Sequence, residues 1–260
     1  NGMILTTGPT GSGKTTTLYT FLRTIYNPAI KVITLEDPIE YHLEGIEQTQ
    51  VDTEKGYDFA NGLRSIVRQD PDVILVGEIR DLETAEVAMH AALTGHLVFS
   101  TLHTNDAAGT IPRLIDLGVK PAIIAPALNI TMAQRLVRKL CLTCKKEGKL
   151  SEEQQKIIQE ESKSFPKSVT IPPQTEWKIF VANPEGCIAC NHTGYKGRLG
   201  IFELIFIDEQ IERMIMTSPS EFDIKKAALQ QGQITMRQDG ILKKLAGMTD
   251  YAEYERVVGV

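Results

Sequence analysis

Short apolar runs alternate with amphipathic segments along the first half of the chain. Four runs have the continuous apolar character of buried strands, and they cover residues 3–7, 31–35, 73–76 and 96–105. Between and after them, apolar residues recur at helical spacing, in residues 14–24, 58–69, 82–93, 106–117 and 122–140. This alternation of strands and helices predicts an α/β fold with a mainly parallel sheet.

The second half of the chain has a different character. A charged segment at residues 151–164 predicts a helix, and a Pro-containing extended stretch follows it to Val181. Residues 194–200 read as a turn that leads into a strand. That strand and three further amphipathic helices are expected at residues 201–205, 208–216, 221–231 and 237–246.

Ser220 and Thr235 precede the last two predicted helices and are suitable N-caps.

These patterns suggest three consecutive parts. We expect a core of alternating strands and helices, a small cysteine-containing subdomain and a C-terminal strand with helices, at residues 1–140, 141–200 and 201–260.

The composition is that of an ordinary globular protein, with 260 residues of which 42% are hydrophobic and 23% are charged. A formal net charge of -5 disfavours a nucleic-acid-binding protein, which normally needs a basic face. No apolar run approaches the length that spans a bilayer, so we expect no transmembrane segment. The first strand begins only two residues after Asn1, so we expect any upstream domain to be missing from this chain.

The segment between the first strand and the first helix matches the phosphate-binding pattern G-x-x-x-x-G-K-[ST]. The matching residues, with the threonine that follows, are Gly8, Pro9, Thr10, Gly11, Ser12, Gly13, Lys14, Thr15 and Thr16. Glycines let backbone N–H groups face phosphate oxygens, and the helix N-terminus adds partial positive charge. Lys14 would reach the β- and γ-phosphates and Thr15 would ligate Mg²⁺. A chance glycine-rich turn is the alternative, but the flanking strand and helix favour nucleoside triphosphate binding.

Acidic residues follow two of the predicted strands. Glu36 to Glu40 come after the second strand, where a carboxylate could orient or deprotonate an attacking water. A solvated acidic loop accounts equally well for this segment alone. Glu78 follows the third strand and could hold Mg²⁺ through water, although Gly77 stands where many phosphate-loop proteins carry Asp.

Two histidines, His96 and His103, flank the fourth predicted strand. Polar residues at a strand tip beside the γ-phosphate can sense its presence. A single histidine is more often structural, but two histidines beside two acid-tipped strands favour a functional role.

The four cysteines form two C-x-x-C pairs, Cys141 with Cys144 and Cys187 with Cys190. Two such knuckles can place four thiolates tetrahedrally around Zn²⁺, and a fully ligated site of this kind is structural. Four ordinary reduced cysteines are the alternative. The long separation of the pairs indicates an insertion between the knuckles.

Taken together, the motifs resemble the secretion ATPase superfamily, which powers bacterial type II secretion and type IV pilus systems. Gly77-Glu78 resembles its atypical Walker B motif, residues 36–40 its Asp box and residues 96–105 its His box. The paired knuckles with residues 193–198 resemble the assembly or extension branch. The retraction and type IV secretion branches lack this metal element.

The resemblance implies a RecA-like fold that uses ATP, Mg²⁺ and Zn²⁺. It implies that Glu40 is the general base, that Glu78 is the Mg²⁺–water ligand, and that His96 and His103 link the γ-phosphate to domain motion. It also implies a cytoplasmic homohexamer, peripheral to the inner membrane through a platform protein. Family members have an upstream domain that clasps nucleotide and supplies arginines, so we expect this chain to bind ATP but hydrolyse it slowly.

Two other classes of function are alternatives. A RecA-like hexameric nucleic-acid motor is disfavoured by the acidic net charge and by knuckles without interleaved aromatic residues. A non-catalytic nucleotide-gated scaffold is disfavoured by the presence of Glu40 and Glu78. The sequence leaves open whether the cargo is an exported protein or a pilin.

Overall fold

The computed structural model describes residues 1–259 and separates into two compact units. The first unit contains residues 1–133 and 204–228, and the second contains residues 134–203 and 229–260. The three consecutive parts expected from the sequence differ from this division, because the C-terminal part is shared between the units. Its first helices belong with the parallel sheet and its last helices with the cysteine-containing unit.

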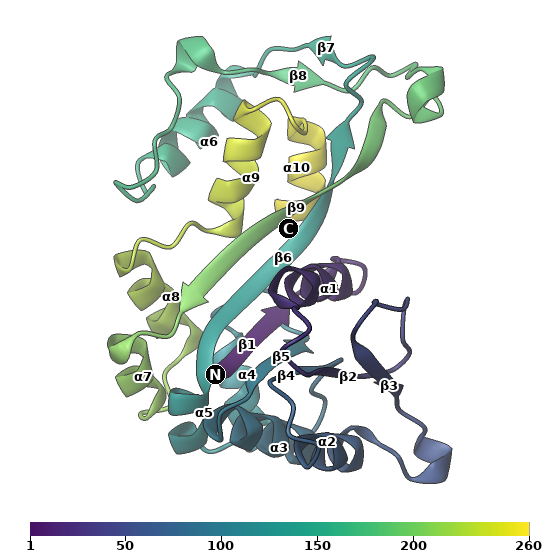
Figure 1. The fold of residues 1–260 in the computed structure, drawn as a ribbon. Coiled ribbons are helices and arrows are strands. Elements are labelled where there is room, and N and C mark those ends of the chain that lie inside the picture. Colours follow the sequence, from purple (N-terminus) through teal and green to yellow (C-terminus); the bar gives the residue numbers. More distant parts are fainter. Residues whose placement is uncertain (260) are drawn as a thin grey trace. The chain divides into compact units, whose positions relative to one another are not determined.

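A seven-stranded sheet runs in the order β3-β2-β4-β5-β1-β6-β9 (Figure 1). All strand pairs from β3 to β6 are parallel. The strands are β1 Gly2–Thr7, β2 Val32–Glu36, β3 Glu47–Gln50, β4 Val73–Val76, β5 Leu97–Leu102, β6 Leu128–Leu140 and β9 Tyr195–Phe206. Because these strands are parallel, the loops after β1, β2, β4 and β5 leave the same edge of the sheet.

Helices cover both faces of the sheet in the first unit. They are α1 Lys14–Ile25, α2 Phe59–Val67, α3 Leu82–Leu93, α4 Thr110–Asp116, α5 Pro121–Ala127, α7 Glu209–Ile215 and α8 Glu221–Gln230. On one face Leu18 and Leu22 of α1 pack in a buried cluster with Leu75 and Phe99 of the sheet. α2 and α3 lie on the other face (Figure 1). The predicted alternation of buried strands and helices is confirmed in this unit.

The segment 128–140 is a correction to the sequence analysis, which expected one helix over residues 122–140. Only Pro121–Ala127 is helical, and Leu128 begins strand β6 beside β1. Pro126 lacks the N–H that a continuing helix needs, so it favours an early end. The β-branched residues that follow suit a strand, and pairing with β1 satisfies their backbone groups.

Within the described residues, the second unit contains three α-helices and a small two-stranded sheet. The elements are α6 Glu152–Ser162, α9 Met236–Leu245, α10 Tyr251–Val258, β7 Lys146–Glu147 and β8 Phe180–Val181. β7 and β8 pair antiparallel. Thr235 caps α9 in a reciprocal arrangement with Gln238, which confirms the predicted N-cap. The short helix α10 and the polar strand β3 were not anticipated.

A buried acid ties α10 to β6 within this unit. Glu253 is 1% exposed and accepts hydrogen bonds from Arg138 Nε at 2.9 Å and from Arg256 Nε at 2.8 Å. Burial opposes ionisation of this carboxyl, but the hydrogen bonds from Arg256 and Arg138 outweigh it and lower its pKa to about 2. Arg138 therefore has a structural role.

Lys244 of α9 is a buried cation without a hydrogen-bond partner for its Nζ among the described residues. Its Nζ lies 4.2 Å from the ring centroid of Tyr251 and 4.4 Å from that of Tyr254. Burial lowers the pKa of Lys244 to about 8, while the negative charge of Glu255 opposes the shift. The two rings therefore offset only part of the desolvation of the ammonium group.

This burial predicts an unusual dependence of stability on pH. Because the folded-state pKa lies below the ordinary value of 10.5, the unfolded chain binds the proton more tightly. Burial of the charged ammonium group therefore lowers the free energy of unfolding. This loss is fully present below pH 8 and disappears as the pH rises toward 10.5. We expect Lys244→Met to unfold with a free energy higher than wild type by up to about 3 kcal/mol at pH 7, and by less at pH 10.

Urea unfolding at the two pH values measures this difference. Lys156→Met, at an exposed position of α6, is the matched control and should show no such pH-dependent gain. An equal response of both variants to pH would contradict the account of Lys244.

Candidate nucleotide site and metal centre

The phosphate loop joins β1 to α1 and has the backbone that its sequence predicts. Gly11 and Gly13 have φ of 76° and 90°, a left-handed region that other residues adopt at a cost. The Lys14 Nζ donates to the carbonyl oxygens of Gly8 at 2.8 Å and Pro9 at 3.3 Å. Burial lowers the pKa of Lys14, and the negative charge of Glu78 opposes this shift. The ammonium group thus lies across its own loop at the start of α1.

A pocket of about 160 Å³ opens beside this loop, at the carboxyl edge of the parallel sheet. It is lined by residues from α1, from the loops after β2 and β4, and from the end of β5 and the residues after it. Among the residues singled out in the sequence, the pocket brings together Lys14, Thr15, Glu40, Glu78 and His103. Residues that are far apart in the chain therefore share one concave site in the first unit.

Glu78 lies at the centre of a charged cluster in this site. Its side chain is 14% exposed and forms an ion pair with Arg80. His103 Nε2 lies 3.4 Å from a Glu78 carboxylate oxygen, and Arg80 lies 4.0 Å from Asp37. The hydrogen bond to Glu78 raises the pKa of Arg80 further. The carboxylate proposed to face Mg²⁺ is held here by neighbouring cationic and imidazole groups.

The close approach of β2 and β4 explains the glycine that precedes Glu78. A Cβ atom at Gly77 would lie 3.2 Å from the Leu35 carbonyl oxygen and 3.4 Å from the Cα of Glu36. The Gly77 N–H donates to that same carbonyl at 2.7 Å, so the contact is fixed by the sheet. A side chain at this position would make a tight contact that the neighbouring backbone must relieve by shifting a few tenths of an ångström, and Glu78 is the acid at this strand end.

Glu36 is a buried carboxylate that the sequence analysis did not distinguish within its acidic segment. It is 3% exposed and accepts hydrogen bonds from the hydroxyls of Tyr19 and Thr34 and from Gln48 Nε2. Burial and the hydrogen bond to Glu36 raise the pKa of Tyr19. Glu40, by contrast, is exposed on the pocket wall. Of the two glutamates, Glu40 is the one whose carboxylate is free of these buried contacts.

The structure separates the two histidines. His96 precedes β5, and its Nδ1 lies 2.9 Å from the Ala91 carbonyl oxygen. β5 runs parallel to β1, with Leu97 beside Gly2 and Leu102 beside Thr7. His96 therefore lies at the amino edge of the sheet, about 20 Å of strand from the phosphate loop. His96 is not among the residues that line the pocket, whereas His103 is, and the expectation that both histidines link the γ-phosphate to domain motion stays a prediction.

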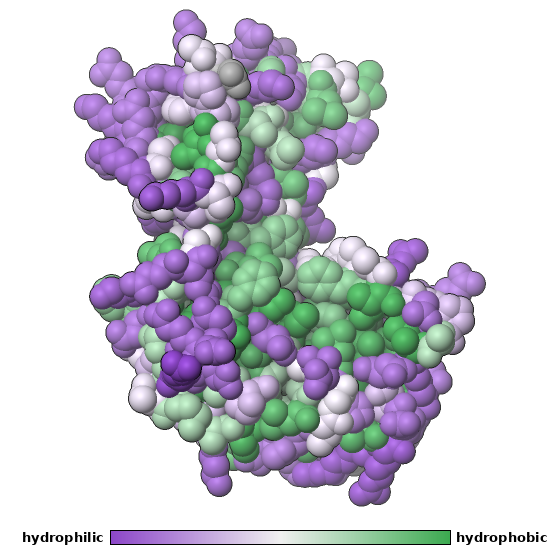
Figure 2. Space-filling model, turned by 60° about the vertical axis from the view of Figure 1, so that its left-hand side comes forward, coloured by the Kyte–Doolittle hydropathy of each residue, from purple (hydrophilic) through white to green (hydrophobic). Residues whose placement is uncertain are grey.

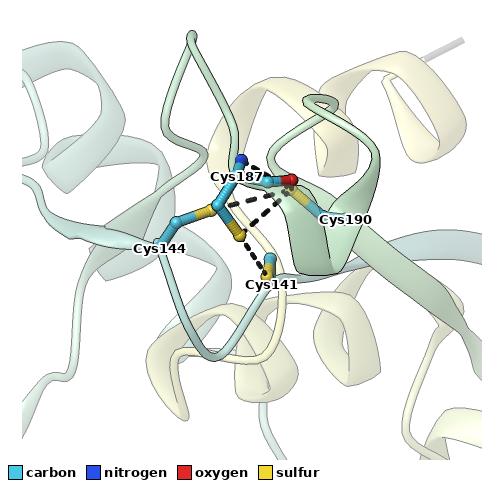
Figure 3. Close-up of side chains that lie close together, drawn as sticks. All are labelled: Cys141, Cys144, Cys187 and Cys190. Carbon is cyan, nitrogen blue, oxygen red and sulfur yellow. Dashed lines mark hydrogen bonds between the residues drawn. The ribbon is translucent and has the colours of Figure 1, made fainter.

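In the second unit, the four cysteines converge (Figure 3). Their Sγ atoms all lie within 4.8 Å of one another. The Sγ atoms of Cys141 and Cys187 are 3.8 Å apart, as are those of Cys144 and Cys190. Four thiolates bound tetrahedrally to Zn²⁺ at about 2.3 Å would be about 3.8 Å apart. The cysteines therefore fit a tetrahedral metal centre.

Backbone groups prepare one of these thiols for ionisation. The Cys187 N–H donates to Cys190 Sγ at 3.2 Å, and the Gly194 N–H donates to the same sulfur at 3.3 Å. Burial opposes ionisation, but these two donors outweigh it and lower the pKa of Cys190 to about 6. A thiolate is the form that binds a metal.

The chain matches the family described as "Type II/IV secretion system protein" over residues 1–256. It belongs to this family. It is 48% identical over 257 residues to the type II secretion system protein E of Aeromonas hydrophila, covering 99% of this chain and 48% of that protein. It is 42% identical over 258 residues to the type IV pilus assembly ATPase PilB of Myxococcus xanthus, covering 99% and 43%. The chain thus spans about half the length of the curated relatives it matches.

Solved structures of related proteins have the same fold. The pilus retraction motor PilT with bound ADP superposes with a TM-score of 0.65 at 30% identity, covering 98% of this chain and 60% of that one. The Legionella pneumophila ATPase DotB superposes with a TM-score of 0.66, covering 98% and 59%, but its 23% identity supports the fold alone. The predicted membership of the secretion ATPase superfamily is confirmed. These names favour it over a nucleic-acid motor.

Beside the pocket of this type II/IV secretion system protein lie residues that the sequence analysis did not single out: Tyr19, Gln48 and Arg80. Arg80 carried a local signal, because it follows Glu78 by two residues. Tyr19 and Gln48 meet Glu36 only through the pairing of β2 with β3 and the packing of α1.

No helix within residues 1–259 combines the length and apolar character needed to cross a bilayer. On the face seen in Figure 2, hydrophilic residues are interspersed with patches of hydrophobic ones.

Proposed function

We propose that this chain is the ATP-hydrolysing motor domain of a bacterial type II secretion or type IV pilus assembly system. The observation that carries the proposal is the convergence of the phosphate loop with Glu40 and Glu78 in one pocket. Relatives named for secretion and for pilus assembly support the biological setting. The proposal treats this chain as one part of a larger secretion or pilus assembly machine.

The residues of the pocket divide the chemistry among them. Backbone N–H groups of the phosphate loop and the Lys14 ammonium bind phosphate oxygens, and the Thr15 hydroxyl ligates Mg²⁺. Glu78 would hold a water on that ion if Mg²⁺ is bound, and Glu40 is placed to orient or deprotonate the attacking water. His103 lies 3.4 Å from Glu78, so it is placed to respond when charge in the pocket changes.

The proposal extends to the mechanical setting. The chain acts as a homohexamer in the cytoplasm, peripheral to the inner membrane through a platform protein. An inner-membrane platform protein transmits the motion to an exported protein or a growing pilus. The relatives named as secretion and pilus assembly ATPases support the link to these two kinds of system.

The four cysteines hold a structural Zn²⁺ in the second unit. Their convergence and their spacing support zinc, and four thiolates leave no open position for catalysis. The ion would stabilise the two knuckles, which are built from turns with little apolar core.

Replacement of the proposed base tests the enzymatic part of the proposal. Glu40→Gln removes a proton acceptor without changing side-chain size, so Mg²⁺-dependent ATP hydrolysis should fall by about 10²- to 10⁴-fold while ATP affinity is retained. Phosphate release and nucleotide titration measure the two quantities in the complete natural protein, because this chain alone is expected to hydrolyse ATP slowly. Glu44→Gln removes an exposed carboxylate from the same loop and should hydrolyse at the wild-type rate. Equal turnover of wild type and Glu40→Gln would contradict the assignment.

Direct metal analysis tests the cysteine centre. We expect one zinc ion per chain in the purified protein, and loss of that zinc with a lower melting temperature in Cys187→Ser, because three ligands cannot close the site. Ile188→Ala changes an 86% exposed side chain on the same knuckle and should retain its zinc. Full zinc occupancy in Cys187→Ser, or none in the wild type, would refute the centre.

A further inference from the structure

Edge strand β3 sends two glutamine side chains toward the loop that carries Glu40. Gln48 and Gln50 are two residues apart on a strand, so they point to the same side. β3 pairs with β2, and residues 37–46 connect the two strands. The contacts of these two glutamines lie on that connecting loop.

Gln48 binds the loop backbone on the carboxyl side of Glu40. Its Oε1 accepts from the Leu43 N–H at 2.7 Å, and its Nε2 lies 3.3 Å from the Tyr41 carbonyl oxygen. One amide side chain thus satisfies a donor and an acceptor of the loop at once.

Gln50 binds the loop on the other side of Glu40. Its Oε1 accepts from the Ile39 N–H at 3.2 Å. The backbone is therefore held at residues 39, 41 and 43, and Glu40 lies within the span that these contacts hold. The Glu40 side chain itself is exposed on the pocket wall.

A buried group fixes the orientation of Gln48. Its Nε2 also donates to Glu36 at 3.1 Å, and Glu36 in turn accepts from Tyr19 and Thr34. A carboxylate accepts and does not donate, so the Gln48 Nε2 faces it and the Oε1 faces the Leu43 N–H. Tyr19 lies on α1, five residues after Lys14, which connects the Glu40 loop to the helix that begins in the phosphate loop.

We propose that Gln48 and Gln50 are positioning residues, which hold the Glu40 carboxylate at the attacking water while phosphate binding depends on other groups. This inference rests on the proposed function, in which Glu40 acts as the base. A base displaced by about an ångström loses much of its effect, although nucleotide still binds.

Kinetics of the complete natural protein test this role. In Gln48→Leu, kcat should fall about tenfold or more while KM for ATP and the affinity for an ATP analogue stay within about twofold of wild type. Gln50→Leu removes one contact at an exposed position and should reduce kcat less. Thr49→Val is the control, since Thr49 points to the opposite side of the strand and contacts Tyr57 at 3.3 Å. It should keep the wild-type kcat.

The double variant Gln48→Leu with Glu40→Gln distinguishes positioning from general damage. If Gln48 acts through Glu40, the double variant should be no slower than Glu40→Gln alone. A further fall in that background, a parallel loss of ATP affinity, or wild-type kcat in both glutamine variants would overturn the positioning role. Wild-type turnover in Glu40→Gln would instead refute the proposed function.

Discussion

The register of the parallel strands is the constraint on which the nucleotide site depends. β1 aligns Thr7 with Leu102 of β5, and β2 aligns Leu35 with Val76 of β4. The loops that follow these residues therefore leave the sheet at the same level and bring the phosphate loop, two acidic segments and His103 to one pocket. A strand slipped by one residue would turn its side chains to the other face and separate these groups.

The charged groups in the pocket contact neighbouring protein groups of opposite polarity. Lys14 lies on carbonyl oxygens of its own loop, and Arg80 and His103 lie beside Glu78. Each of these contacts is one that a negatively charged nucleotide with its metal ion would compete for. Glu36 does not take part in these contacts. Its buried carboxylate already accepts hydrogen bonds from the neutral Tyr19 and Thr34 hydroxyls.

The sequence predicts the parts of the structure that local patterns encode. The phosphate loop, the early strands and the cysteine pairs each have a signature within a few residues. Strand β6 was misassigned because apolar spacing in 128–140 does not by itself separate a helix from a strand, and pairing with β1 decides the outcome. β3, with the sequence Glu-Gln-Thr-Gln, has no apolar signal, so its pairing with β2 and its contacts with the Glu40 loop are visible only in three dimensions.

Equilibrium binding of a fluorescent ATP analogue with Mg²⁺ tests the central claim most directly, because it asks whether this pocket binds triphosphate. The account predicts saturable binding that weakens about tenfold or more in Lys14→Ala, since a charged hydrogen bond to phosphate is lost. Lys31→Ala, which changes an exposed contact with the Gln69 carbonyl before β2, should bind like wild type. Equal affinity of Lys14→Ala and wild type would contradict the account.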